Sequence, residues 1–245
     1  VNNDGCDEFA VGARSEDLGT SNQGTVHVIF GWGGDGCPSE PLEIVLAAGF
    51  TSSNFGWSLD GNIDVTGDLI PDLVVGAPTT ASEGNRVGAA YLISGAYIGS
   101  LFPQATLAHA NSLPAPLPLG DSLNPMSRVL GENTGEEFGV QVKLLPQMGN
   151  NYAPGIAVGS LYSSSLGYNR TGAVLGFQYD DTTKALDTLP VFAIIGETEK
   201  PDSAMGASIE TFNNDAHAYI AVGSSLMSSV SLDQGACFVV DASLF

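Results

Sequence analysis

The sequence predicts an all-β fold, a β-propeller built of four-stranded antiparallel blades, and three observations lead to it. Short apolar runs of Val, Ile, Thr, Tyr and Phe alternate with Gly, Pro, Asn and Asp throughout the 245 residues, which is typical of strands and turns. These runs recur in units of similar length. Each unit holds about four runs that suit strands better than helices. Such units must stack face to face, because one small sheet cannot bury both of its faces.

Two series of glycines mark the repeat. The first series follows an apolar triplet, and its members are Gly12, Gly76, Gly159 and Gly223, at intervals of 64, 83 and 64 residues. The second series precedes an apolar run, and its members are Gly24, Gly88, Gly172 and Gly235, at intervals of 64, 84 and 63 residues. Apolar–Gly pairs open the later units, at Phe55–Gly56, Phe138–Gly139 and Met205–Gly206. Matching intervals in independent series make a chance repeat improbable.

These landmarks divide the chain into blade units. The first unit is residues 1–54, truncated at its start, and the second is 55–137; the third is 138–204, and the incomplete fourth is 205–245. The longer interval in the second unit marks an insertion at about residues 100–126, which contains Pro103, Pro114, Pro116, Pro118 and Pro125. Because Pro cannot donate to a strand ladder, the insertion is predicted to be an extended surface segment without ladder strands.

The charge balance excludes some partners. The 27 acidic and 7 basic residues give a formal net charge of −20. Nucleic acids and anionic lipid surfaces would be repelled, whereas cations would be attracted. Solubility or a saline habitat explains this negative charge as well as a specific function of the acidic residues does. No apolar run has the length of a membrane-spanning helix, so no direct membrane insertion is expected.

The three cysteines, Cys6, Cys37 and Cys237, form neither a disulfide framework nor a zinc pattern. Two interpretations stay open: one Cys6–Cys37 bridge formed in an oxidising compartment, or three unpaired core residues. His27 alternates with apolar residues in a predicted strand, which favours a structural role over a catalytic one.

A candidate metal loop lies between Phe55–Gly56 and Gly76. Oxygen-bearing side chains occupy its first, third, fifth and ninth positions, which are Asp64, Thr66, Asp68 and Asp72, and the carbonyl of Ile70 supplies the seventh. Hard oxygen ligands, most of them carboxylates, suit Ca²⁺ better than Mg²⁺. Zinc would favour His or Cys. The alternative is a polar turn between strands, where Asp and Gly are common in any case.

Other registers and units fit the metal pattern less well. An EF-hand register from Asp60 fails at Pro71, where the last acidic ligand would stand. Aligned on Gly12, the first unit offers a truncated second loop, with Asn2, Asp4 and Glu8 as side-chain ligands and the Cys6 carbonyl in the seventh position. The corresponding segments of the third and fourth units have fewer acidic residues, so we expect them to lack a metal.

Phe55–Gly56, the Asp64–Asp72 loop and Gly76–Ala77–Pro78 together resemble an FG-GAP repeat, the unit of the integrin α-subunit propeller. The resemblance covers nearly the whole chain apart from the insertion. It implies a seven-bladed propeller, of which about four units are present, with Ca²⁺ loops on one face, partner-binding loops on the other, and an extracellular or cell-surface location. Thr66 and Leu69 stand where that family usually has Asn or Asp and Gly, which predicts weak binding, on the order of 10⁻⁴–10⁻³ M.

The expected function is therefore a Ca²⁺-binding extracellular module for adhesion, and not an enzyme. Its partners would be a protein or glycan ligand at the cell surface and further blades or chains that complete the propeller. Two alternatives remain: a structural subunit of an extracellular filament or envelope, and an accessory propeller of an enzyme whose catalytic domain lies elsewhere. Gly31–Gly36 matches a dinucleotide fingerprint, but Cys37–Pro38 follows it where a helix should begin.

Overall fold

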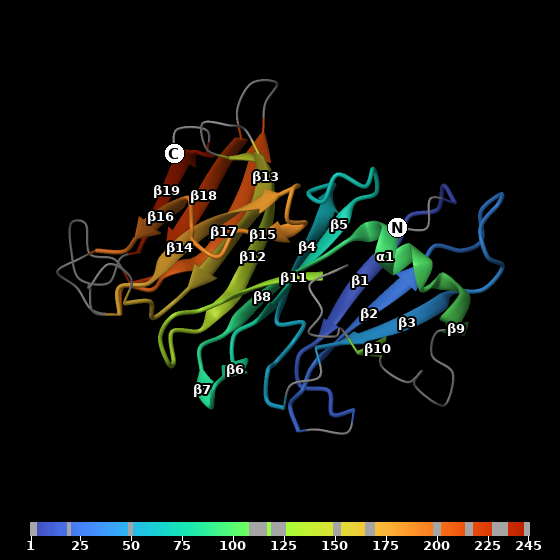
Figure 1. The fold of residues 1–245 in the computed structure, drawn as a ribbon, viewed down its shortest axis with the longest axis horizontal. Coiled ribbons are helices and arrows are strands. Elements are labelled where there is room, and N and C mark those ends of the chain that lie inside the picture. Colours follow the sequence, from blue (N-terminus) through green and yellow to red (C-terminus); the bar gives the residue numbers. More distant parts are fainter. Residues whose placement is uncertain are drawn as a thin grey trace.

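The computed structural model describes residues 4–18, 21–48, 51–107, 117–118, 126–148, 153–164, 170–197, 202–213, 218–226 and 235–242. Within these ranges nearly all regular structure is β, so the predicted all-β class is confirmed. Four main antiparallel sheets follow one another across the molecule in chain order, from blue to red (Figure 1). The described helices are all too short to cross a membrane.

The first two sheets come from residues before 131. Sheet 1 contains β1 (Phe9–Ala13), β2 (Thr25–Phe30) and β3 (Leu42–Ala47). Sheet 2 contains β4 (Ser58–Ile63), β5 (Asp72–Ala77), β8 (Ala89–Ile93) and β11 (Met126–Leu130), in the order β11-β8-β5-β4. A small hairpin of β6 (Ala81–Ser82) and β7 (Asn85–Arg86) lies between β5 and β8 in the chain.

The last two sheets repeat this plan. Sheet 3 contains β12 (Phe138–Met148), β13 (Ala153–Ser160), β14 (Ala173–Asp180) and β16 (Phe192–Ile195), with β15 (Ala185–Leu186) paired to the end of β14. Sheet 4 contains β17 (Met205–Asn213), β18 (Ala218–Ser224) and β19 (Ala236–Asp241). The glycines of both repeat series therefore lie at the same places in successive sheets.

The prediction that residues 100–126 form no ladder strands is wrong at two places. β9 (Thr106–Leu107) pairs antiparallel with β3, and β10 (Leu117–Pro118) pairs parallel with it. Both are two-residue strands at the edge of sheet 1, where Pro is tolerated because its missing N–H need not serve a further strand. The segment before β9 holds α1 (Gly95–Ser100) and a 3₁₀ turn (Phe102–Gln104). Pro114, Pro116 and Pro125 lie outside the described residues.

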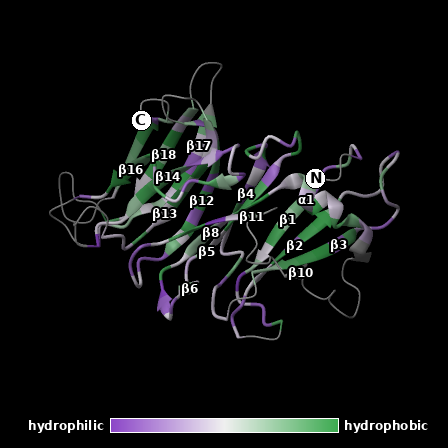
Figure 2. Ribbon diagram, viewed as in Figure 1, coloured by the Kyte–Doolittle hydropathy of each residue, from purple (hydrophilic) through white to green (hydrophobic). Residues whose placement is uncertain are grey.

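The core lies between the sheets. Alternate side chains of each strand point to opposite faces, so each sheet contributes one apolar layer to each neighbour. The layer between sheets 1 and 2 includes Phe30, Phe55 and Tyr91, all fully buried, and Phe55 meets Tyr91 edge to face. Figure 2 shows hydrophobic residues gathered on most strands, whereas hydrophilic residues occupy many of the connections and parts of β12 and β17.

The sheets approach most closely at glycine backbones. Gly56, Gly139 and Gly206, from the apolar–Gly pairs, have φ of 85°, 93° and 85°, which a side chain would oppose. Their backbones contact the first-series glycines of the preceding sheet, in the pairs Gly56–Gly12, Gly139–Gly76 and Gly206–Gly159. A Cβ atom on any of these first-series glycines would collide with that backbone, so this position requires glycine at three successive interfaces.

Candidate metal centre

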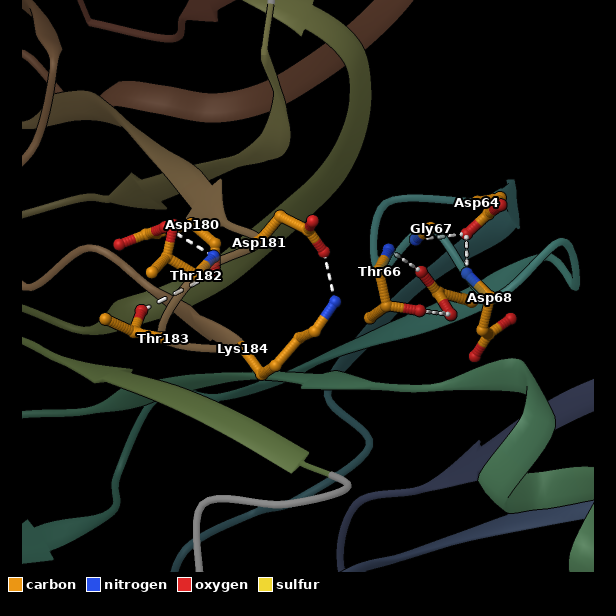
Figure 3. Close-up of polar contacts among 10 residues, drawn as sticks. Asp64, Thr66, Gly67, Asp68, Asp180, Asp181, Thr182, Thr183 and Lys184 are labelled. Carbon is orange, nitrogen blue, oxygen red and sulfur yellow. Dashed lines mark hydrogen bonds and ion pairs between the residues drawn. The ribbon is translucent and has the colours of Figure 1, made fainter.

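The Asp64–Asp72 loop connects β4 to β5 in sheet 2 and brings three carboxylates together. One oxygen each of Asp64, Asp68 and Asp72 lies within 4.8 Å of the others. The Thr66 hydroxyl donates to Asp72 Oδ1 at 3.1 Å, which places the fourth predicted oxygen at the same cluster (Figure 3). Four of the predicted side-chain ligands thus converge. The role of the Ile70 carbonyl as a ligand stays a prediction.

Hydrogen bonds to Asp64 determine the curvature of the loop. Its Oδ1 accepts from the amides of Gly67 at 2.7 Å and Asp68 at 3.2 Å, and its Oδ2 accepts from the amide of Leu69 at 2.9 Å. Asp side chains commonly organise turns in this way. Gly67 and Leu69 adopt φ of 76° and 70°. Leu69 therefore has a left-handed backbone, which costs a side-chain-bearing residue about 1–2 kcal/mol.

The start of α1 supports the other two carboxylates. Ser94 caps this helix, and its hydroxyl donates to Asp68 Oδ2, which also accepts from the amide of Ala96 at 3.3 Å. The amide of Gly95 donates to Asp72 Oδ1 at 2.8 Å. These donors lie more than twenty residues beyond the loop, and no motif in the sequence indicated them.

Asp72 accepts four hydrogen bonds from nearby backbone and side-chain donors. Its Oδ2 accepts from the amides of Val65 and Thr66, both at 2.7 Å. Its Oδ1 accepts from Thr66 and Gly95, so each oxygen takes two hydrogen bonds. A carboxylate offers about four lone-pair directions. Asp72 therefore clamps the loop, and it could bind a cation directly only if a donor such as the Thr66 hydroxyl turned away.

The carboxylates differ in their acidity. Burial raises the pKa of Asp72, and the four donors only partly offset this effect. Burial also disfavours the charged form of Asp68, but hydrogen bonds from Ser94, Ile70 and Ala96 outweigh it, so the pKa of Asp68 is lowered. Asp68 is therefore ionised at neutral pH and is a strong candidate ligand. The clustered oxygen donors fit a hard cation such as Ca²⁺.

The hairpin between β14 and β15 of sheet 3 lies beside this loop (Figure 3). Lys184 and Tyr179 line a cavity of about 240 Å³ together with Thr66 and Asp68. The Lys184 ammonium is paired with Asp181. Burial raises the pKa of the Tyr179 hydroxyl, and although Lys184 opposes this, the negative charges of Asp181 and Asp68 add to the rise. The loop and the neighbouring sheet are thus electrostatically linked, a relation that the sequence did not reveal.

The first-unit loop keeps part of the same geometry. The amide of Cys6 donates to Asp4 Oδ1 at 2.8 Å, just as the amide of Ile70 donates to Asp68 Oδ1 at 2.9 Å. Among the described residues, Asp64, Asp68 and Asp72 form the only group of three His, Cys, Asp or Glu side chains whose ligand atoms lie within 4.8 Å of one another, and Asp4 and Glu8 do not belong to such a group. Asn2 lies outside the described residues.

A disulfide joins this first loop to the segment after β2. Cys6 is bonded to Cys37, with their Cα atoms 5.9 Å apart, so the bridged alternative holds, and Cys237 is a free, exposed thiol. A cavity of about 530 Å³ is lined by Asp4 and Glu8 of the first loop and by Ile70 and Asp72 of the main loop. The two loops therefore border the same cavity.

His27 occupies a structural position, as its strand pattern indicated. It lies on β2, and its ring nitrogens contact the carboxylates of Glu43, on β3, and Glu16, after β1, the latter at 2.8 Å. Burial tends to lower the pKa of His27, but the hydrogen bonds to Glu43 and Glu16 outweigh burial and raise it. The His27 ring therefore ties the segment after β1 to the middle of sheet 1.

Comparison with known proteins finds similarity to integrin α subunits. It is 28% identical to human "Integrin alpha-7" over 248 aligned residues, which cover 99% of this chain and 17% of that protein. It is 29% identical to the mouse "Integrin alpha-7" over 241 residues, or 95% of this chain and 17% of that protein. No protein-family model matches. The chain thus spans about a sixth of the length of these curated relatives, and the similarity agrees with the FG-GAP-like pattern of its repeats.

Proposed function

We propose that this chain is part of a Ca²⁺-binding β-propeller of the integrin-α type, which serves adhesion or ligand binding outside the cell. The convergence of Asp64, Asp68 and Asp72 between β4 and β5 carries the proposal, because the FG-GAP resemblance marks this loop for Ca²⁺. The 28% sequence identity with human integrin alpha-7 and the repeated glycine contacts between sheets support this proposal. The ion would rigidify the loop, and the partner would be a protein or glycan at the cell surface.

The role of the ion follows from the hydrogen bonds of the loop. Asp64 and Asp68 hold the backbone of residues 67–70, and Asp68 also holds the start of α1. An ion shared by these carboxylates would fix α1 and the β4–β5 connection relative to each other. It would also relieve the repulsion between clustered negative charges. This role is structural, so we propose a binding module and not an enzyme.

Thermal unfolding tests the metal claim. The chain would be melted with about 10 mM Ca²⁺, with Mg²⁺ and with chelator. A dissociation constant of about 10⁻⁴–10⁻³ M predicts about 1.4–2.7 kcal/mol of added stability in Ca²⁺. For a chain of this length that corresponds to a Tm rise of about 3–10 °C. Mg²⁺ should give a smaller rise, because it demands stricter octahedral geometry.

Two variants make this test specific. Asp68→Ala removes a ligand together with hydrogen bonds, so its Tm in chelator will fall, and the informative quantity is the Ca²⁺-induced rise, which should vanish. Asp35→Ala removes an exposed carboxylate far from the loop in sequence and should keep the whole rise. An equal rise in both variants would mean that Ca²⁺ acts through the general negative charge of the chain. If Ca²⁺ did not raise the Tm of the parent protein, the loop would be a polar turn that binds no Ca²⁺.

A further inference from the structure

Three polar side chains of sheet 1 converge on the ring of His27. Thr25 and His27 lie two residues apart on β2, so both side chains point to the same face of the sheet. Glu43 reaches the ring from β3, and Glu16 reaches it from the turn after β1. The side chains of Glu43, His27 and Glu16 are 5%, 15% and 21% exposed. Three segments of the chain therefore contribute to one largely buried polar cluster.

The two nitrogens of the His27 ring have different surroundings. Nδ1 contacts a carboxylate oxygen of Glu43. Nε2 lies 2.8 Å from Glu16 Oε2 and 3.2 Å from Thr25 Oγ1. The Thr25 hydroxyl also donates to Glu16 Oε2. One end of the ring thus has a single acceptor, whereas three potential metal ligands, Nε2 and the two oxygens, are gathered at the other end.

The spacing of these three atoms fits one metal ion. Atoms that bind the same ion at about 2.1 Å lie about 3.0–3.4 Å apart, for bond angles between octahedral and tetrahedral. The distances of 2.8 Å and 3.2 Å from Nε2 to the two oxygens are close to this range. Thr25 Oγ1 and Glu16 Oε2 lie closer together because a hydrogen bond joins them. An ion that replaced this hydrogen bond would let the two oxygens separate.

Glu43 stands where a metal-binding histidine needs a partner. Such histidines usually donate their other ring N–H to a carboxylate or a carbonyl, which fixes the tautomer and orients the ring. A proton on Nδ1, donated to Glu43, leaves the lone pair of Nε2 directed at Glu16 and Thr25. An imidazole nitrogen favours Zn²⁺ and other transition-metal ions over Ca²⁺. This cluster therefore differs in chemistry from the all-oxygen loop between β4 and β5.

The charge of the cluster also favours a divalent ion. Among the residues that the structure describes, the ion pairs of Glu16 and Glu43 are both with His27. Two carboxylates and one doubly protonated ring leave one negative charge uncompensated. A divalent ion bound to the neutral ring would balance both carboxylates. Uncompensated charge in a largely buried cluster is costly, so the ion would stabilise the folded chain.

We propose that His27 Nε2, Glu16 and Thr25 form a site for a divalent transition-metal ion, with Zn²⁺ as the expected ion. His27 and Glu16 are the principal ligands, and the neutral Thr25 hydroxyl is the weaker one. Water completes the coordination beside Glu16, which has the most exposed side chain of the ion-paired residues. Any proton on Nε2 passes to solvent when the ion binds. Glu43 is a positioning residue, because it contacts the ring and not the ion.

Calorimetric titration with Zn²⁺ tests the site. The exposed thiol of Cys237 would also bind Zn²⁺, so Cys237→Ser is the reference chain, and excess Ca²⁺ in the buffer competes for other carboxylates. The reference chain should bind one Zn²⁺ ion saturably. Glu16→Gln and His27→Gln should each abolish saturable binding. Glu43→Gln keeps the ligands and should raise the dissociation constant about 10–100-fold.

The other two histidines provide matched controls. His109→Gln and His217→Gln each remove one imidazole and should leave the affinity for Zn²⁺ unchanged. Nitrogen NMR of the histidine rings in the reference chain tests the assigned atom without a change to any ligand. Zn²⁺ should shift the Nε2 resonance of His27, whereas Nδ1 should remain protonated because it donates to Glu43.

Several outcomes would overturn the proposal. Absence of saturable binding would do so, as would binding that survives both Glu16→Gln and His27→Gln, or a resonance shift at His109 or His217 instead of His27. Loss of Zn²⁺ binding in Asp68→Ala alone would place the ion at the acidic loop of sheet 2. Equal affinities of Glu43→Gln and the reference chain would contradict the positioning role. The Ca²⁺-induced Tm rise is a separate measurement, so failure of this site is distinct from failure of the Ca²⁺ loop.

Discussion

Substitution of Gly159 by Ala probes the contact between sheets 3 and 4. The new Cβ would lie 2.7 Å from the carbonyl oxygen of Gly206 and 3.2 Å from Ile209 Cδ1. Ordinary contact begins at 3.4 Å, so the two backbones must separate by about 0.7 Å, the difference between 3.4 and 2.7. Overpacking of this kind costs about 1–3 kcal/mol. The loss of chain entropy in the unfolded state returns about 0.4–1 kcal/mol.

The net expectation is a loss of about 1–2 kcal/mol in the free energy of unfolding, measured by urea titration with circular dichroism. Gly223→Ala is the matched control, because Gly223 holds the same place in sheet 4, yet its new Cβ would meet chiefly the Ser208 hydroxyl, which can rotate away. That variant should keep or slightly raise the stability of the parent. If Gly159→Ala were as stable as Gly223→Ala, close backbone packing would not be what conserves glycine at this position of the repeat.

Three further predictions concern single features of the fold. Leu69→Gly relieves a left-handed backbone while removing a side chain that is 91% exposed, so it should raise stability by about 0.5–1 kcal/mol; Gly67→Ala, at φ 76° with open space around it, should lower it by about 1 kcal/mol. A lower free energy of unfolding for Leu69→Gly would contradict the claim that the backbone of Leu69 is strained. The pKa of His27 is raised by folding, so its contribution to stability is complete below about pH 6.5 and is lost as the pH rises through the raised pKa. The Tm difference between the parent and His27→Gln should therefore shrink with rising pH, and a constant difference would refute the charged state. Reduction of the Cys6–Cys37 disulfide, which joins residues 31 apart, should lower the free energy of unfolding by about 3–4 kcal/mol. In a variant with both cysteines changed to Ser, the reductant should leave the free energy of unfolding unchanged.

The repeat pattern accounts for most of what the sequence predicted. Apolar triplets before Gly76 and Gly159 became β5 and β13, because period and turn residues define short strands locally. The oxygens of Asp64, Asp68 and Asp72 converge because they belong to one short loop. Local spacing is sufficient for features of this kind.

Other features depended on segments that are distant in the chain. The donors of Ser94 and Gly95 reach the candidate metal loop only because β5 and β8 are neighbours. Lys184 approaches it from another sheet. β10 pairs at the edge of sheet 1, although Pro118 argued against any strand. Composition and spacing carry no information on such pairings, because they arise from how whole sheets are placed.

Because main-chain atoms make the glycine contacts between sheets, these contacts restrict sequence change less than side-chain contacts would. Where two surfaces meet through side chains, a change on one side demands a matching change on the other. Here the sheets meet at Gly12–Gly56, Gly76–Gly139 and Gly159–Gly206 through backbone atoms, which every residue shares. Units can therefore drift independently, as Met205 in place of Phe illustrates, while the stacking is kept. Low overall identity with a retained glycine spacing is the form of relationship that this packing permits.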